Sequence, residues 1–154
     1  AEAQVGEALE CLGGNGYVEE SGLPRLYREA PVNAIWEGSG NIQALDLLRV
    51  LSRTPEAYDA WRDEVAAASG ADARLDVALR EADSVVRRAD PARSRELGVR
   101  MAVLMQASLL LRHAPPFVSE AFCASRLPMP GAVFGTLAPG ADARAIVARA
   151  AVPR

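Results

Sequence analysis

One carboxylate of this chain stands between bends that contain glycine. Glu37 is followed directly by Gly38-Ser39-Gly40-Asn41, and the glycine-rich run at 13–16 precedes it. Glycine weakens a helix interior, and serine and asparagine favour helix caps, so Glu37 is expected at a helix entrance. The apolar spacing from Ile42 to Leu51 predicts the helix that follows and braces the loop. A carboxylate in that place can act as a general base.

Both features also have plain structural interpretations. The glycines within 13–16 would let backbone N–H groups approach an anionic or polar ligand, as a pyrophosphate loop requires. Such a run also commonly ends a helix. The charge of Glu37 would equally favour the dipole of the helix that begins near Asn41. The residue types alone leave both alternatives open.

Helices are predicted along the whole chain, since the alternating pattern typical of strands is nearly absent. A first helix is expected to run to about Leu12 and to stop at Gly13-Gly14. Pro24 suits the first turn of a short helix that Pro31 ends.

The second half of the chain is predicted to be an antiparallel helical bundle. Thr54-Pro55 and Asp90-Pro91 each combine an N-cap residue with proline at the first helical position, which predicts two helix starts. Apolar residues with helical spacing cover 58–68, 75–86 and 97–111, and further helices are expected at 117–126 and from about 141. The segment 97–111 is apolar nearly all round and should be buried on several sides. Short connections between such helices imply antiparallel packing.

The glycine run and the Glu37 turn together resemble the motifs of the acyl-CoA dehydrogenases, flavoenzymes that oxidise the Cα–Cβ bond of acyl thioesters. In that family a GGNG(F/Y) loop touches the flavin, and an EG(T/S)-x-(Q/N) turn supplies the catalytic Glu. Residues 7–41 carry this resemblance, and the connecting segment Leu23–Pro31 points to the AidB-like branch of the alkylation-damage response. Phe122–Leu127 and Phe134–Leu137 resemble the closing segments of the same branch.

The resemblance implies a role for each matching residue. Glu37 would be the base that removes the α-proton of an acyl-CoA while a hydride leaves the β-carbon for flavin N5. The implied FAD contacts are Gly13, Gly14, Asn15, Gly16, Ser39 and Asn41. Ser39 and Asn41 are equally good helix N-caps. Glu10 departs from the family, which often has Gln at this position. A Gln amide can donate a hydrogen bond to the flavin or its ribose, whereas an ionised carboxylate only accepts, so this departure puts one cofactor contact in doubt.

The resemblance also implies a domain organisation. The 154-residue chain begins without Met inside a helical apolar pattern, so we expect residues 1–154 to be the C-terminal helical part of a longer flavoprotein. Residues 1–53 would carry the flavin and catalytic loops, and residues 54–154 an additional helical bundle. The α-helical and β domains of the family would precede them, and the glycine loop would reach the flavin of a neighbouring subunit in a homotetramer. The expected activity is FAD-dependent acyl-CoA dehydrogenation, with the isolated chain inactive.

Arginine supplies all the positive charge of the chain, and its distribution is uneven. Residues 1–40 hold two arginines against seven acidic residues, a net charge of −5, whereas residues 74–112 hold eight against five, a net charge of +3. Interleaved charges usually mark a solvated helix face. Because the AidB-like branch binds double-stranded DNA through its C-terminal domain, the alternative function is DNA association with little dehydrogenase activity. The residues that would contact phosphate are Arg87, Arg88, Arg93 and Arg95.

The residue types give no support for a disulfide-rich, metal-binding, secreted or membrane-spanning protein. Cys11 and Cys123 are far apart among apolar neighbours, which predicts two buried, reduced thiols. His113, the only histidine, has no metal-site pattern and stands where it would favour a helix C-terminus. No stretch has the pattern of a signal peptide or a membrane span, so we expect a cytoplasmic protein without a metal.

Overall fold

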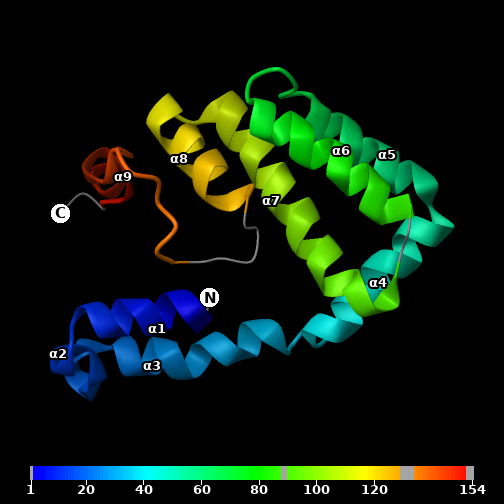
Figure 1. The fold of residues 1–154 in the computed structure, drawn as a ribbon. Coiled ribbons are helices and arrows are strands. Elements are labelled where there is room, and N and C mark those ends of the chain that lie inside the picture. Colours follow the sequence, from blue (N-terminus) through cyan, green and yellow to red (C-terminus); the bar gives the residue numbers. More distant parts are fainter. Residues whose placement is uncertain (1, 88–89, 129–133, 152–154) are drawn as a thin grey trace. The chain divides into compact units, whose positions relative to one another are not determined.

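The computed structural model describes residues 2–87, 90–128 and 134–151, which form helices and turns without a strand (Figure 1). The α-helices are α1 (Glu2–Cys11), α2 (Gly14–Tyr17), α3 (Leu23–Glu29), α4 (Gly40–Arg53), α5 (Pro55–Ala66), α6 (Ala73–Arg87), α7 (Ser94–His113), α8 (Pro116–Arg126) and α9 (Ala143–Ala150). The 3-10 helices are η1 (Glu19–Ser21), η2 (Ala30–Ala34) and η3 (Pro91–Arg93). The all-α prediction is therefore confirmed. The chain divides into two units, residues 1–44 and 45–154, with the boundary inside α4.

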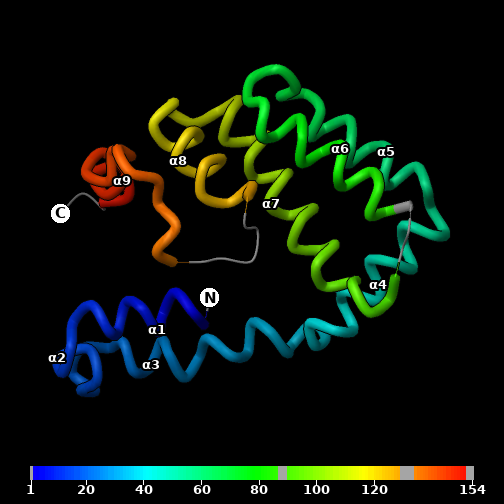
Figure 2. The backbone as a smooth tube through the Cα atoms, viewed as in Figure 1, coloured from blue at the N-terminus to red at the C-terminus, as the bar shows by residue number. Residues whose placement is uncertain are grey.

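The larger unit is built around α7. This helix packs against α5, α6 and α8, and Figure 2 shows the chain reversing direction between α5 and α6 and again between α6 and α7. The buried core consists of Val65, Ala68, Leu75, Leu79, Ala82, Val103, Leu104, Ala107, Cys123 and Leu127. These positions confirm the predicted apolar faces of 58–68 and 75–86 and the burial of 97–111 on several sides. Each large apolar side chain buried there contributes roughly 1.5–3 kcal/mol.

Side-chain hydrogen bonds also tie the helices of this unit together. The fully buried Ser108 hydroxyl on α7 donates to the backbone carbonyl of Glu64 on α5 at 3.2 Å. The Tyr58 hydroxyl donates to Asp83 Oδ1 on α6 at 2.6 Å, and Arg62 Nε donates to the same oxygen at 3.0 Å. These bonds satisfy polar groups at the helix interfaces, where a buried donor or acceptor without a partner would destabilise the fold.

The two predicted Pro-containing helix starts differ in detail. α5 begins at Pro55 as predicted, but the Thr54 hydroxyl makes no capping hydrogen bond within the described residues. The Asp90 side chain does cap, because it accepts a hydrogen bond from the Ala92 backbone N–H at 2.8 Å. The turn that it caps is the 3-10 helix η3, so the α-helical part starts only at Ser94.

The smaller unit has few buried residues. α1 packs against α2, α3 and η2, yet the buried residues among 2–44 are Gly16, Pro24, Ala30 and Ala44. The large apolar side chains that remain 46–78% exposed are Leu12, Tyr17, Val18, Leu26, Tyr27, Val32, Ile35, Trp36 and Ile42.

The two cysteines have different environments. Cys123 is fully buried in the core of the larger unit, as predicted. Cys11 is exposed, so the prediction of burial is wrong for this residue. Cys11 has apolar neighbours along the sequence, but it ends α1 in the unit with few buried residues, where no layer of side chains covers it.

Candidate functional site

The glycine loop ends α1 and turns the chain into α2. α1 stops at Cys11, and the Gly13 N–H donates to the Glu10 carbonyl at 2.9 Å. Gly13 has a φ of 56°, a conformation that glycine adopts without the steric cost of a Cβ. The predicted helix stop at this run is therefore confirmed, and α2 begins directly after it at Gly14.

The glycines of the loop serve different purposes. A Cβ on Gly16 would lie 2.2 Å from the Leu9 carbonyl oxygen, so Gly16 allows the loop to pack closely against the backbone of α1. A Cβ on Gly13 or Gly14 would meet no atom within 4 Å. The outer side of the loop at Gly13, Gly14 and Asn15 is exposed and open to a ligand.

Glu37 lies in the turn that connects η2 with α4. The Gly38 N–H closes this turn by donating to the Ile35 carbonyl at 2.9 Å, and Gly38 has a φ of 107°. Glu37 is exposed, and no described residue forms a hydrogen bond or ion pair with its carboxylate. Trp36 beside it is 67% exposed. Among the described residues the turn thus presents a carboxylate without a partner, preceded in the sequence by an exposed tryptophan, at the helix entrance that the sequence predicts.

The first turn of α4 braces the backbone that follows Glu37. The Ser39 carbonyl accepts the first helical hydrogen bond, from the Gln43 N–H at 3.0 Å, so Ser39 occupies the N-cap position. Its hydroxyl makes no hydrogen bond to a described residue and is free for another partner. Asn41 is exposed and already lies inside the helix. The Gln43 side-chain amide donates to the Gly38 carbonyl at 3.1 Å, a brace that the sequence prediction missed.

The glycine loop and the Glu37 turn do not meet within the smaller unit. Figure 1 shows α2 and the start of α4 at opposite ends of α3. The segment between them is helical almost throughout, from Leu23 to Ala34, and therefore holds them apart. One ligand touching both within a single copy would have to span that distance.

The residues present fit one side of a flavin site. The exposed edge at Gly13, Gly14 and Asn15 allows a planar or anionic group to approach the backbone, and the Ser39 hydroxyl is free. However, the N–H groups of Gly13 and Gly16 already donate to the Glu10 and Gly13 carbonyls, both at 2.9 Å. The loop thus offers an exposed backbone surface to a ligand, but two of its backbone N–H donors are already used within the chain.

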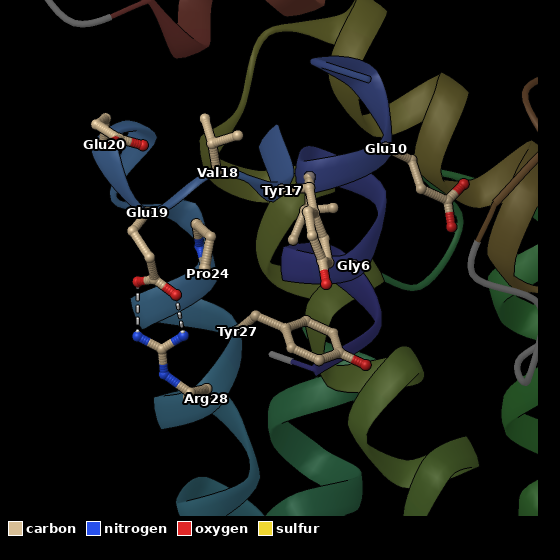
Figure 3. Close-up of a pocket in the computed structure, with 10 residues that line it drawn as sticks. Gly6, Glu10, Tyr17, Val18, Glu19, Glu20, Pro24, Tyr27 and Arg28 are labelled. Carbon is tan, nitrogen blue, oxygen red and sulfur yellow. Dashed lines mark hydrogen bonds and ion pairs between the residues drawn. The ribbon is translucent and has the colours of Figure 1, made fainter. Parts of the chain in front are cut away.

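Sequence reasoning missed a cavity of about 730 Å³ in the smaller unit. Its lining includes Glu10, Tyr17, Glu19, Glu20, Tyr27 and Arg28, which come from α1, α2, η1 and α3 (Figure 3). Arg28 donates to both carboxylate oxygens of Glu19, at 2.7 and 2.9 Å, and this interaction lowers the pKa of Glu19. Glu19 and Arg28 are nine residues apart in the sequence, a separation that no helical or strand period predicts. Their pairing depends on the packing of η1 against α3.

The predicted phosphate-contacting arginines are only partly described. Arg93 donates through Nε to Glu96 at 2.9 Å, and Arg100 donates to the same carboxylate at 3.0 Å. Both arginines lower the pKa of Glu96, Arg93 the more strongly. Arg95 is exposed and has no partner within the described residues. Arg88 and the side chain of Arg87 lie outside the described residues.

The described part of the chain offers neither a metal site nor a membrane span. No group of three or more His, Cys, Asp or Glu side chains is placed to hold a metal ion there. None of the described helices is long and apolar enough to span a membrane.

Comparisons with known proteins match both units. Residues 1–52 match the model of the acyl-CoA dehydrogenase C-terminal domain. The chain is 43% identical over 129 residues to the putative acyl-CoA dehydrogenase AidB of Escherichia coli (strain K12), which covers 84% of this chain and 24% of that protein.

Two further relatives match shorter stretches. The chain is 56% identical over 48 residues to acyl-CoA dehydrogenase family member 11 of Caenorhabditis elegans, covering 31% of this chain and 8% of that protein. It is 42% identical over 40 residues to butyryl-CoA dehydrogenase of Syntrophomonas wolfei, covering 26% of this chain and 7% of that protein. The chain thus spans about a quarter or less of the relatives that it matches. The match of residues 1–52 and the similarity to AidB over most of the sequence show that the chain belongs to the acyl-CoA dehydrogenase family, in its AidB-like branch.

Proposed function

We propose that residues 1–53 form part of the FAD site of an acyl-CoA dehydrogenase-like flavoprotein and that Glu37 is its general base. The observation that carries this proposal is the free carboxylate of Glu37, exposed on a turn that Gly38 closes and α4 braces. It lies in the segment that matches the family's C-terminal domain. FAD, when bound, would supply the acceptor for the hydride that leaves the β-carbon of the acyl-CoA.

The chain's own contribution to the reaction would be proton removal and orientation. A carboxylate without an internal partner can accept the α-proton without first breaking a hydrogen bond. The exposed Trp36 ring, one residue earlier in the chain, would offer apolar surface to a ligand, and a rigid helix start positions a catalytic group better than a flexible loop does. Ser39 would add a hydroxyl donor and Asn41 an amide, both at the start of α4.

The separation of the two loops supports an oligomeric site. Because the glycine loop and the Glu37 turn lie at opposite ends of α3 (Figure 1), Gly13, Gly14 and Asn15 would touch the flavin of a neighbouring subunit. Gly16 would then act indirectly, by holding the loop against α1. We therefore propose a homo-oligomer, a homotetramer, in which the upstream domains supply the remaining walls of the site.

Association with double-stranded DNA is a second candidate function. The similarity to AidB extends beyond residues 1–52, so the branch assignment includes the helices that carry the arginines. The exposed Arg95 supports phosphate contact, because it has no acidic partner within the described residues. The pairing of Arg93 with Glu96 favours a solvated, internally neutralised face instead. The dehydrogenase proposal therefore has the stronger basis.

The deciding experiment is Glu37→Gln in a chain that also carries the upstream domains. Glutamine keeps the size and the hydrogen-bonding head but cannot take the proton, so flavin reduction by an acyl-CoA should slow by roughly 10²–10⁴-fold in stopped flow. Flavin should stay bound. Glu29→Gln is the matched control, because Glu29 is also exposed and lies on α3. Near-normal reduction in the Glu37 variant would leave only a helix-dipole role, with a stability loss of about 1 kcal/mol or less.

A further inference from the structure

The residue that follows Glu37 is a glycine in a conformation that favours glycine. Gly38 has a φ of 107°, and a Cβ there would also lie 3.5 Å from Cγ2 of Ile42. Glycine has more backbone freedom than any other residue. A carboxylate beside it would therefore change place with the turn, unless the backbone of Gly38 is held from both sides.

Two hydrogen bonds hold the backbone of Gly38. Its N–H donates to the Ile35 carbonyl at 2.9 Å, and its carbonyl accepts from the Gln43 side-chain amide at 3.1 Å. The first bond ties the turn to the residues before Glu37, and the second ties it to α4. Gln43 contributes twice, because its backbone N–H also donates to the Ser39 carbonyl at 3.0 Å. Both peptide groups that follow Glu37 are thus fixed.

The bond from the Gln43 side chain is local and separable from the helix. It joins two residues five positions apart, both within residues 1–44, so no other element is needed to form it. Gln43 is exposed, and methionine has nearly the same helix propensity and side-chain length as glutamine. Gln43→Met therefore removes the amide donor and leaves the start of α4 intact.

We propose that Gln43 is a positioning residue for Glu37. This role rests on the proposed function of Glu37 as general base. Proton transfer requires the reacting atoms to lie about 3–3.5 Å apart, and a displacement of about 1 Å can slow a reaction roughly 100-fold. Gln43 acts on the backbone of Gly38, and by holding the turn in one conformation it increases the fraction of time that the Glu37 carboxylate spends in place.

Amide hydrogen exchange in the 154-residue chain tests the brace without flavin or substrate. In Gln43→Met the Gly38 amide, followed by NMR, should exchange roughly 2- to 12-fold faster, the range that corresponds to one hydrogen bond of ordinary net strength. Gln106→Met is the matched control, because Gln106 is exposed on α7 in the other unit, and it should leave exchange at Gly38 unchanged. Equal exchange in the two variants would overturn the proposal.

The consequence for the reaction is measured in a chain that carries the upstream domains. Flavin reduction at saturating acyl-CoA should slow by the same factor of roughly 2 to 12 in Gln43→Met. Flavin content and the acyl-CoA concentration for half-saturation should not change. The pH dependence of the rate should keep its midpoint, because the substitution replaces one neutral side chain by another.

A double-mutant cycle shows whether Gln43 acts through Glu37. Adding Gln43→Met to Glu37→Gln should slow flavin reduction no further, because the carboxylate that Gln43 positions is already absent. A further slowing of similar size, or loss of flavin from Gln43→Met, would assign Gln43 a general structural role and overturn the proposal.

The two proposals fail in different ways. A slow Glu37→Gln variant with a normal Gln43→Met variant leaves Glu37 as the base and removes the positioning role of Gln43. Normal reduction in Glu37→Gln removes the base, and the positioning role with it.

Discussion

Alanine substitutions in the glycine loop separate packing from ligand contact. In Gly16→Ala the new Cβ would lie 2.2 Å from the Leu9 carbonyl oxygen and 3.0 Å from the Leu9 carbonyl carbon. Both are backbone atoms, so α1 itself must move away. In Gly14→Ala the new Cβ meets no atom within 4 Å. The two changes therefore add the same methyl group at two positions of α2, one where there is no room and one where there is.

The expected magnitudes follow from these contacts. Forcing a methyl group into a closed site typically costs about 1–3 kcal/mol, so local opening of the α1–α2 region should become roughly 5- to 150-fold more frequent in Gly16→Ala. Gly14→Ala should be neutral, or stabilising by up to about 1 kcal/mol, because alanine is the better helix former. Gly13→Ala should cost roughly 1–2 kcal/mol, since its φ of 56° strains a residue with a Cβ.

Hydrogen exchange of backbone amides measures this effect directly. Exchange in peptides from residues 2–29 should accelerate in Gly16→Ala and stay at the wild-type rate, or slow, in Gly14→Ala. Peptides from α5 to α8 serve as an internal control, because their core lies in the other unit. Equal protection in the two variants would refute the packing role of Gly16.

Three further predictions concern the cofactor, the arginines and the thiols. The purified 154-residue chain should be colourless, since its loops would form only one side of a flavin site, and stoichiometric flavin absorbance would contradict this. If the arginines contact DNA, the affinity for duplex DNA should fall steeply with salt concentration. Alanine replacement of four residues should flatten this salt dependence, and an unchanged slope would show that they do not contact phosphate; these residues are Arg87, Arg88, Arg93 and Arg95. At pH 8 a thiol reagent should modify the exposed Cys11 readily and the buried Cys123 only on unfolding. Burial raises the pKa of the Cys123 thiol to about 11, and the thiolate is the reactive form. Fast reaction of a folded Cys11→Ser variant would refute this.

The helices of the larger unit could be predicted from sequence because their periodicity and their burial agree. Val65 and Ala68 on one predicted face, and Leu75 and Leu79 on the next, are the residues that the core encloses. The 3-10 segments were not predicted, because a single turn has too few residues to show a period. η3 illustrates this, since Asp90 marks the start correctly but gives no sign that the first turn is 3-10.

The candidate site could be predicted only where the signal is local. Glycine and serine around Glu37 fix a helix entrance through the backbone preferences of those residues, and the structure has that entrance. The role of Gly16 depends on a contact with Leu9, which no local pattern announces. The separation of the two loops depends in the same way on how the segment from α3 to η2 continues as helix. The catalytic role of Glu37 and the flavin contacts stay predictions.

Core burial and the family motifs reside in different parts of this chain. The core lies in residues 45–154, whereas the family motifs lie in residues 1–52, where few side chains are buried. A segment with little buried surface opens easily, and a ligand or partner that binds only its folded form stabilises it, by about 2.7 kcal/mol at a hundred times the dissociation constant. Flavin affinity and the order of α1–α2 should therefore be coupled. In a chain that carries the upstream domains, Gly16→Ala should weaken flavin binding by the fraction of time that the loop is open, although Gly16 is turned into α1 and away from the exposed edge of the loop.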